Sequence, residues 1–546
     1  MKPFDASGGF RSSTDDGGLR RSAIRGAGVT VFAQGVSISL QMIATVVLAR
    51  LVTPADFGLV TMVTVFSLLL VSFGQIGLQE VVVQRGEMDH LLASNLFWIN
   101  MGGSMLLTIG FASAGSLLAG FYGEPRVAEV AVGLSLTIFI TSTSVLHLAL
   151  LKRAMRFSEV STTDILARIV SVTVSIVLAW AGWGYWALVG GAIAQPLAGS
   201  IGAWVFCRWV PGLPRRGVAG TGSLVRSAVH VNASWNVDYL ARNLDNILLG
   251  WRFGTDSLGF YKKAYDLFAL PANQLLSVAP VAVSTLSRLY QEPAQFRRYF
   301  LGGLSVLALV GMGVGADLTL VGKDLVRLVL GPGWETSGEM FMFFGPGIGI
   351  MLIYRTYNLI HLSIGTTANF LRWRIIECTV TALLFFLALP WGPVGIAAAW
   401  TTSFWILIIP AFHYAGRPIL LGITAVVATV WKYFLASLLA GCATHVIIQG
   451  IPSLVAASGS VGAVARIVTT SLLFVILYLG AIIILHRGCA PLYHFVGLMQ
   501  EMIPRYRFSR PSTAEAEATH DDGANETPGQ PVRGSRPEAS CVHRAG

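Results

Sequence analysis

Long apolar runs alternate with short polar segments along almost the whole chain. A membrane helix needs about 20 consecutive apolar residues, and runs of that kind predict an all-α polytopic membrane protein with fourteen spans. The two pairs within 166–207 and 372–413 are separated by very tight turns. The expected spans are 29–49, 57–80, 92–119, 127–151, 166–181, 185–207, 227–251, 265–287, 299–321, 339–363, 372–389, 393–413, 425–448 and 463–485.

The pattern of the first six spans recurs in the next six at a shift of about two hundred residues. The segment 49–60 (ARLVTPADFGLV) matches 250–261 (GWRFGTDSLGFY), with Gly58 opposite Gly259. In the same way 115–125 matches 322–334, and 183–192 matches 391–400. Six spans return a chain to its starting face, so the copies are parallel repeats. Two such lobes predict a central site between them and alternating access to it.

This repeat divides the chain into seven expected parts. They are a polar cytoplasmic segment (1–28), a first six-helix lobe (29–207), a cytoplasmic linker (208–226), a second six-helix lobe (227–413), two additional spans (414–486), an interfacial amphipathic helix (487–508) and a disordered cytoplasmic tail (509–546). Leu, Phe and Met at helical spacing predict the amphipathic helix, and the Glu/Ser/Pro/Gly-rich composition predicts the disorder.

Polar and charged side chains mark the seventh span, residues 227–254. An ionised side chain at the centre of a membrane helix costs about 2.5–3.5 kcal/mol, so Asp238, Arg242 and Asp245 cannot face lipid. Either aspartate can lie one helical turn from Arg242. A stripe at steps of three or four predicts the wall of a water-filled cavity, the alternative being a neutralised cluster that holds helices together. The stripe comprises Asn232, Trp235, Tyr239, Arg242 and Asn246, and Asn236 lies beside it.

Composition and charge agree with a membrane protein and fix its expected orientation. The 546 residues are 54% hydrophobic and 12% charged, against about 25% charged in soluble domains. With both termini cytoplasmic, only eight of the 38 Lys and Arg fall on the opposite face, as the positive-inside rule requires. The basic residues therefore orient the protein in a membrane and do not indicate a nucleic-acid partner. The five cysteines form no metal-ligand spacing.

The hairpin segment 48–60, the segment 243–271 and the two-lobe layout of fourteen spans resemble a known family. They are similar to the polysaccharide transporters, or Wzx-type flippases, of the multidrug/oligosaccharidyl-lipid/polysaccharide exporter superfamily. The resemblance covers residues 25–486 and implies a non-enzymatic transporter in the bacterial inner membrane. It implies that undecaprenyl-diphosphate-linked oligosaccharide is turned from the cytoplasmic to the periplasmic leaflet for exopolysaccharide, capsule or lipopolysaccharide assembly. Implied partners are that lipid-linked glycan, membrane lipids and polysaccharide polymerase and co-polymerase proteins.

The chemistry of the spans fits such a substrate. Arg242 and Arg355 are the basic residues placed well inside spans, and a guanidinium binds phosphate oxygens through directed, charge-assisted bonds. Aromatic rings and amides beside Arg355, such as Tyr357 and Asn358, suit sugar faces and hydroxyls. A pairing of Arg355 with Glu377 is the alternative. No cofactor is expected, but proton or sodium coupling is an open possibility, for which the candidate carboxylates are Asp238, Asp245, Glu80 and Glu377.

Three other functions stay open at this point. A cation-coupled multidrug exporter of the same superfamily usually has twelve spans and an acidic residue in its first lobe, whereas 29–49 and 57–79 contain none. A membrane glycosyltransferase or polymerase needs a large outer loop or an acid/base pair beside an outer cleft, and the longest non-cytoplasmic loop here has about 17 residues. A non-transporting scaffold of the polysaccharide machinery is the third.

Overall fold

The fold was analysed in a computed structural model of the chain. The structure describes residues 3–4, 10, 16–84, 88–215, 222, 236, 239–276, 279–455 and 459–502. The predicted tail 509–546 therefore lies outside the described residues. The same holds for residues 227–238 of the predicted span 227–251, apart from Asn236. Within the described part the regular secondary structure is helical, with isolated bridge residues at Phe4, Phe10 and Asp89.

The first lobe consists of α1–α7. Their bounds are α1 (Asp16–Leu51), α2 (Pro54–Gln84), α3 (His90–Ser113), α4 (Gly115–Tyr122), α5 (Arg126–Arg153), α6 (Phe157–Trp180) and α7 (Tyr185–Cys207). The expected single span 92–119 is thus two helices, α3 and α4. The interruption falls at Ala114, and the next residue, Gly115, lies against α5, where an added Cβ would be 3.1 Å from the carbonyl oxygen of Ala128.

The second lobe and the additional helices follow. Their bounds are α9 (Leu244–Leu276), α10 (Ala279–Arg288), α11 (Pro293–Leu330), α12 (Glu335–Arg355), α13 (Tyr357–Ile364), α14 (Thr367–Ala388), α15 (Gly392–Gly416), α16 (Ile423–Gln449), α17 (Pro452–Val455), α18 (Gly459–His486) and α19 (Ala490–Met502). The expected span 339–363 is again split, at Thr356 between α12 and α13. Helix α19 lies within 487–508, where an interfacial amphipathic helix is predicted, and that prediction stays a prediction.

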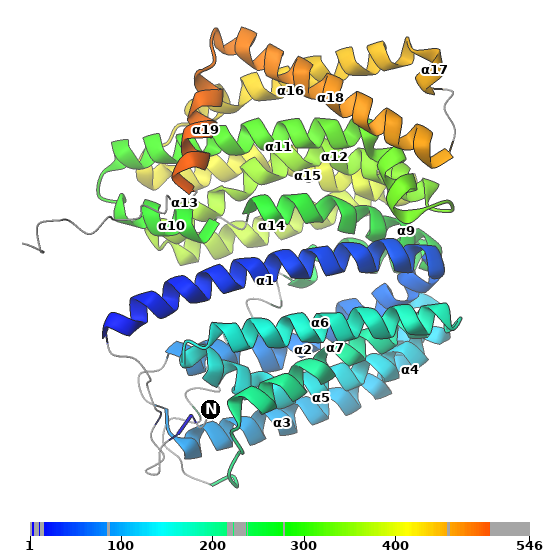
Figure 1. Ribbon diagram of the computed structural model, residues 1–546, viewed down its shortest axis with the longest axis vertical. Helices are drawn as coiled ribbons and strands as arrows, with labels where there is room; N and C mark the ends of the chain where they lie inside the picture. The colour runs from blue at the N-terminus through cyan, green and yellow to red at the C-terminus, as the bar shows by residue number, and fades with distance from the viewer. Residues whose placement is uncertain are drawn as a thin grey trace, which may run out of the picture. The chain divides into compact units, whose positions relative to one another are not determined.

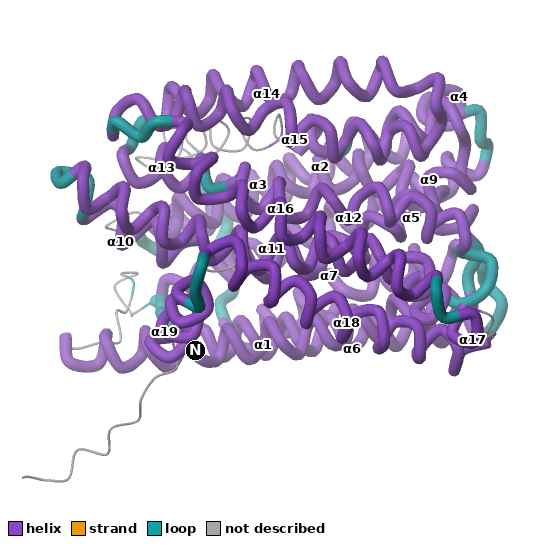
Figure 2. Tube along the Cα trace, turned by 90° about the horizontal axis from the view of Figure 1, so that it is seen from above, coloured by secondary structure: helices purple, strands orange, loops and turns teal. Residues whose placement is uncertain are grey.

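The predicted membrane-spanning character is confirmed. In the described part, 11 segments are long and apolar enough to cross a bilayer, and one of them, Ala368–Ile419, contains both α14 and α15. Figure 2 shows the long helices running side by side, with their turns gathered at the two ends. The protein is therefore an all-α, multi-pass membrane protein. We call the end that carries the turns at Val52–Thr53, Gly123–Pro125, Gly254 and Gly331–Trp334 the hairpin end.

The two lobes have the same internal design, as the sequence repeat predicted. Helix α4 ends at Gly123 (φ 69°) and α11 at Gly331 (φ 95°), two positions that the repeat had paired. Gly184 (φ 53°) likewise precedes α7, and Gly392 (φ 74°) begins α15, the last helix of each lobe. Positive φ values favour glycine because it has no Cβ, which explains why these glycines recur. Figure 1 shows α2–α7 on one side of α1 and α9–α15 on the other.

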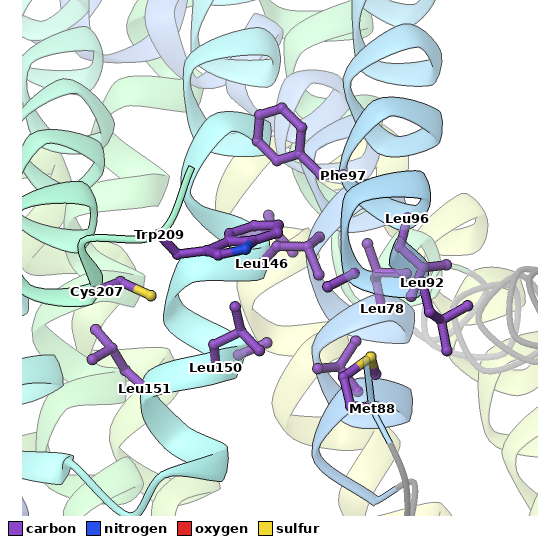
Figure 3. Close-up of a cluster of buried hydrophobic side chains, with 14 of the residues drawn as sticks. Leu78, Met88, Leu92, Leu96, Phe97, Leu146, Leu150, Leu151, Cys207 and Trp209 are labelled. Carbon is purple, nitrogen blue, oxygen red and sulfur yellow. The ribbon is translucent and has the colours of Figure 1, made fainter. Parts of the chain in front are cut away.

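The first part of the interlobe linker is fixed to the first lobe. Trp209 is buried in an apolar cluster with Leu146, Leu150 and Cys207 (Figure 3), and its carbonyl oxygen is 3.1 Å from Nε2 of the buried His147. The side chain of Asn95 forms two hydrogen bonds of 2.8 Å with the backbone of Arg215. Residues 208–215 therefore belong to the first lobe in structural terms.

Helices α16 and α18 pack on α11, at the flank of the second lobe. Arg466 of α18 donates two hydrogen bonds, of 2.9 and 2.6 Å, to the carboxylate of Asp324 in α11. Farther along the same two helices, Tyr478 donates to the carbonyl oxygen of Leu309 at 2.8 Å. Polar contacts inside a membrane are costly to leave unpaired, so these bonds determine how the additional helices dock.

Loss of the Arg466–Asp324 pair is expected to loosen this docking. Arg466→Met leaves a partly buried carboxylate without its partner, and we expect a loss of about 2 kcal/mol in the free energy of unfolding, the size of a hydrogen bond to a charged group. Thermal unfolding of the purified protein measures it. The matched control is Arg126→Met, which removes an exposed arginine whose hydrogen bond lowers the pKa of Glu124. If Arg126→Met lowers the stability as much as Arg466→Met does, the prediction is contradicted.

Candidate functional site

Helix α9 is the element that positions the candidate site. Gly254 (φ 78°, ψ −170°) interrupts it, so that α9 has two arms that meet at the hairpin end. Across this bend the buried carboxylate of Asp245 accepts a hydrogen bond of 2.7 Å from the hydroxyl of Tyr261, and it also accepts one of 2.8 Å from the backbone N–H of its neighbour Asn246. Asp245 therefore holds the two arms together.

The first arm presents the predicted stripe only in part. Arg242 is exposed, Tyr239 is half-buried, and Asn246 is buried with its amide donating to Asn243 at 3.2 Å. Asn236 is buried and hydrogen-bonded to Ser72 of α2, so it joins the two lobes. The predictions for Asn232, Trp235 and Asp238, and for the side chain of Glu80, lie outside the described residues.

The structure brings Arg242 and Arg355 together, although they are 113 positions apart in the sequence. Arg355 is the last residue of α12 and is half-buried. Arg242 and Arg355 lie within electrostatic range of each other and of the hydroxyl of Tyr265 in the second arm of α9. Two cations near one another inside a membrane protein provide a site for an anion that carries more than one negative charge.

Glu377 lies near Arg355 and has closer partners. Its carboxylate accepts a hydrogen bond of 2.8 Å from the hydroxyl of Tyr357 and one of 3.2 Å from Arg374, one helical turn away in α14. Tyr357 is fully buried and packs against Trp373 and His361. Arg374 therefore balances the charge of Glu377 at close range. The Arg355–Glu377 pair considered as an alternative is not the main contact of Glu377.

Two amide oxygens beside these arginines have no hydrogen-bond partner. They are Oδ1 of Asn246, four residues after Arg242, and Oδ1 of Asn358, three residues after Arg355. A buried polar atom without a partner costs free energy, and such atoms in a folded protein call for an explanation. A ligand that donates hydroxyl groups would satisfy them.

Sequence reasoning missed Lys262 and Tyr265, which belong to the same neighbourhood. Lys262 lies 5.8 Å from the ring centroid of Tyr265, forms an ion pair with Asp266 and acts electrostatically on Tyr265. The sequence pattern places Lys262 in the loop before the eighth expected span, 265–287, and Tyr265 at the first position of that span. The spacing of Lys262, Tyr265 and Asp266 at steps of three and four is the signal that could have found them, because it places all three on one helical face.

At the hairpin end the two lobes touch without intervening side chains. A Cβ added to Gly58 of α2 would lie 1.8 Å from the carbonyl oxygen of Thr255, and one added to Gly259 of α9 would lie 1.8 Å from that of Pro54. Pro54 and Thr255, like Gly58 and Gly259, are 201 positions apart, so the crossing of α2 and α9 is a two-fold contact between the repeats. We call it the glycine crossing.

Further contacts surround the glycine crossing. Trp334 donates from its indole nitrogen to the carbonyl oxygen of Ala49 at 2.9 Å, and Arg50 donates to that of Leu328 at 3.1 Å. Phe57 of the first lobe contacts two residues of the second: its ring centroid is 5.7 Å from that of Trp334 and 3.8 Å from the ammonium of Lys263. The hairpin end is thus closed by direct contacts between the lobes. Among the described residues there is no group of three or more His, Cys, Asp or Glu that could hold a metal.

These features define a two-lobe, multi-pass membrane protein with a cationic pair in its second lobe. Residues 47–339 match the model of a family described as polysaccharide biosynthesis protein. The chain belongs to this family.

Comparisons with individual proteins also find proteins named for polysaccharide biosynthesis. The chain is 25% identical over 326 residues to the lipopolysaccharide biosynthesis protein WzxC of Escherichia coli, covering 58% of this chain and 65% of that protein. It is 19% identical over 362 residues to the succinoglycan biosynthesis transport protein ExoT of Rhizobium meliloti, covering 66% and 73%. The chain thus spans slightly less than two thirds of WzxC.

The fold is shared with solved transporters. The lipid II flippase MurJ in an inward closed conformation superposes with a TM-score of 0.67 at 14% identity, covering 85% of this chain and 99% of that one. An inward-facing multidrug resistance MATE family transporter superposes with a TM-score of 0.56 at 15% identity, covering 70% and 94%. At these identities the likeness establishes the architecture, which is the predicted one.

Proposed function

We propose that this protein is a flippase for polysaccharide biosynthesis. It moves undecaprenyl-diphosphate-linked oligosaccharide units from the cytoplasmic to the periplasmic leaflet of the bacterial inner membrane, with both termini in the cytoplasm, and it does so without a chemical reaction. The observation that carries the proposal is that Arg242 and Arg355, which are far apart in the sequence, lie within electrostatic range of each other and of Tyr265. Two guanidinium groups match a diphosphate in charge and in hydrogen-bond geometry.

The surroundings of the arginine pair suit the rest of such a substrate. Asn246 and Asn358 each offer a buried oxygen that accepts no hydrogen bond, and sugar hydroxyls are donors. Tyr265 stands at the edge of an aromatic cluster with Phe268, Phe344 and Trp400. The names of WzxC and ExoT place relatives of this chain in lipopolysaccharide and succinoglycan biosynthesis, which favours a glycan over a drug as the cargo.

The test is the fate of lipid-linked oligosaccharide in a host that lacks this protein. We expect the oligosaccharide to accumulate in the cytoplasmic leaflet, where inverted vesicles expose it to added glycosidase and intact spheroplasts do not. The wild-type chain should relieve the accumulation. An absence of accumulation would overturn the proposal and favour a multidrug exporter or a non-transporting scaffold.

A further inference from the structure

A groove of about 550 Å³ lies in the second lobe, apart from the arginine pair. It is lined by α11, α12 and α15, and among the described residues none from the first lobe or from α9 lines it. Since α12 also packs against α9, the groove lies on a different side of α12 from the glycine crossing. Phe343, at 45% exposure, and the exposed Pro346 form part of its wall. Because Glu335–Ile364 is one of the segments apolar enough to cross a membrane, its exposed apolar side chains are expected to meet lipid.

Apart from Lys323 at its edge, the described residues that line the groove have no side-chain donor to spare. Three threonines line it, and each hydroxyl already donates to a backbone carbonyl: Thr319 to Gly315 at 2.7 Å, Thr401 to Phe343 at 2.7 Å, and Thr402 to Ala398 at 2.8 Å. Met342, Val394 and Ala398 complete an apolar lining. A groove of this volume and polarity suits a hydrocarbon chain, because ligand pockets of about 300–1,000 Å³ are mostly apolar with few polar groups.

A single ion pair marks the edge of the groove. Nζ of Lys323 is 3.7 Å from Oε1 of Glu339, and the two side chains are 61% and 56% exposed. At this distance and exposure the pair contributes little to stability, so both groups are available to a ligand. Lys323 lies near the end of α11 and Glu339 near the start of α12, which places the pair close to the hairpin end. The edge carries no net charge, in contrast to the arginine pair.

We propose that this groove binds one bilayer phospholipid with a zwitterionic headgroup that contains a primary ammonium. An acyl chain occupies the apolar groove, the phosphodiester contacts Lys323, and the ammonium contacts Glu339. An anionic lipid would bring its charge against Glu339 without compensation. A choline headgroup has no N–H to donate. The site is separate from the proposed transport site and does not depend on the proposed function.

Native mass spectrometry of the full chain, purified in detergent and titrated with single lipids, tests the site. We expect one phosphatidylethanolamine to be retained about tenfold more strongly than phosphatidylglycerol or phosphatidylcholine with the same chains, the effect of one charge-assisted contact. Lys323→Ala and Glu339→Ala should each bring the three lipids to similar retention. Val394→Trp fills the groove and should remove the retained lipid, whereas Leu383→Trp, at an exposed position of α14, should keep it.

Three outcomes would overturn the proposal. Equal retention of all three lipids by the wild-type chain would mean that only annular lipid is present. Stronger retention of phosphatidylglycerol would show an anionic site. Unchanged selectivity in both alanine variants would remove the headgroup contacts, and because these two side chains are exposed, their replacement is not expected to disturb folding.

Discussion

Replacing Arg355 by alanine is expected to lower transport of lipid-linked oligosaccharide by about 10- to 100-fold. The reason is the loss of a charge-assisted, bidentate contact to the diphosphate, and each factor of ten corresponds to about 1.4 kcal/mol. Arg242→Ala should have an effect of similar size. Arg355→Lys keeps the charge and loses the planar fork of donors, so we expect it to retain part of the activity. The leaflet distribution of the oligosaccharide in the complemented host is the measurement.

The matched control for these variants is Arg252→Ala. Arg252 is also in α9 and is exposed, and its guanidinium lies 5.9 Å from the ring centroid of its neighbour Phe253 at the hairpin end. Its removal changes the net charge as much as Arg242→Ala does, and we expect transport to be unchanged. Normal transport by both Arg242→Ala and Arg355→Ala, at normal expression, would show that the diphosphate is bound elsewhere. The flippase proposal would then stand without this site.

Double replacement distinguishes one shared site from two independent ones. If Arg242 and Arg355 bind the same diphosphate, the double alanine variant should lose less than the product of the two single losses, because groups that act together are not additive. If the loss of transport in the double variant equals the product of the two single losses, the two arginines act at different steps of transport. The position of Arg242 within electrostatic range of Arg355 favours the shared site.

Sequence reasoning reached the arginines because their cost inside a membrane is large enough to demand an explanation. It could pair Arg242 with Arg355 only by assuming the lobe arrangement, since no local pattern joins two residues 113 positions apart. It could not choose the partners of Asp245 and Glu377. A carboxylate on a helix has several neighbours within reach, and Asp245 bonds to Tyr261 across a bend that depends on one glycine conformation.

The fold was easier to predict than the site, for a related reason. The length of a spanning helix follows from the bilayer thickness, and the repeat can be read from the chain alone. Together they predict the two lobes and the additional helices. The interruptions at Ala114 and Thr356 were missed because a break between two apolar helices changes neither hydropathy nor length. Lys262 and Tyr265 were missed because a charged residue just outside an apolar run is indistinguishable in sequence from a loop residue, although α9 continues through both.

The glycine crossing supplies the second large expected effect. Gly58→Leu or Gly259→Leu would place side-chain atoms where the backbone oxygen of Thr255 or Pro54 now lies. Backbone atoms cannot rotate away as a flexible side chain can, so the lobes must separate at the hairpin end. We expect either variant to lose at least about tenfold in transport and to increase the distance between spin labels at Thr53→Cys and Asp256→Cys, two exposed positions flanking the crossing.

The control for this effect is Gly110→Leu in α3, where an added Cβ would have nothing within 4 Å. It adds the same apolar side chain to a membrane helix and should change neither transport nor the label distance. Loss of transport with an unchanged label distance would show that the lobes stay closed and that the variant fails for another reason. An increased distance with normal transport would show that closure at the hairpin end is not needed for the transport cycle.

In the proposed alternating-access cycle, the glycine crossing is the contact that closes the hairpin end. A lobe pair that rocks about a central site must close one end while the other opens, and here the hairpin end is closed by backbone contact, the indole bond of Trp334 and the arginine bond of Arg50. Because the crossing is two-fold, Gly58→Leu and Gly259→Leu disturb one contact from its two sides. The double variant should therefore open the hairpin end no further than either single variant, and additive opening would mean that the two glycines act separately.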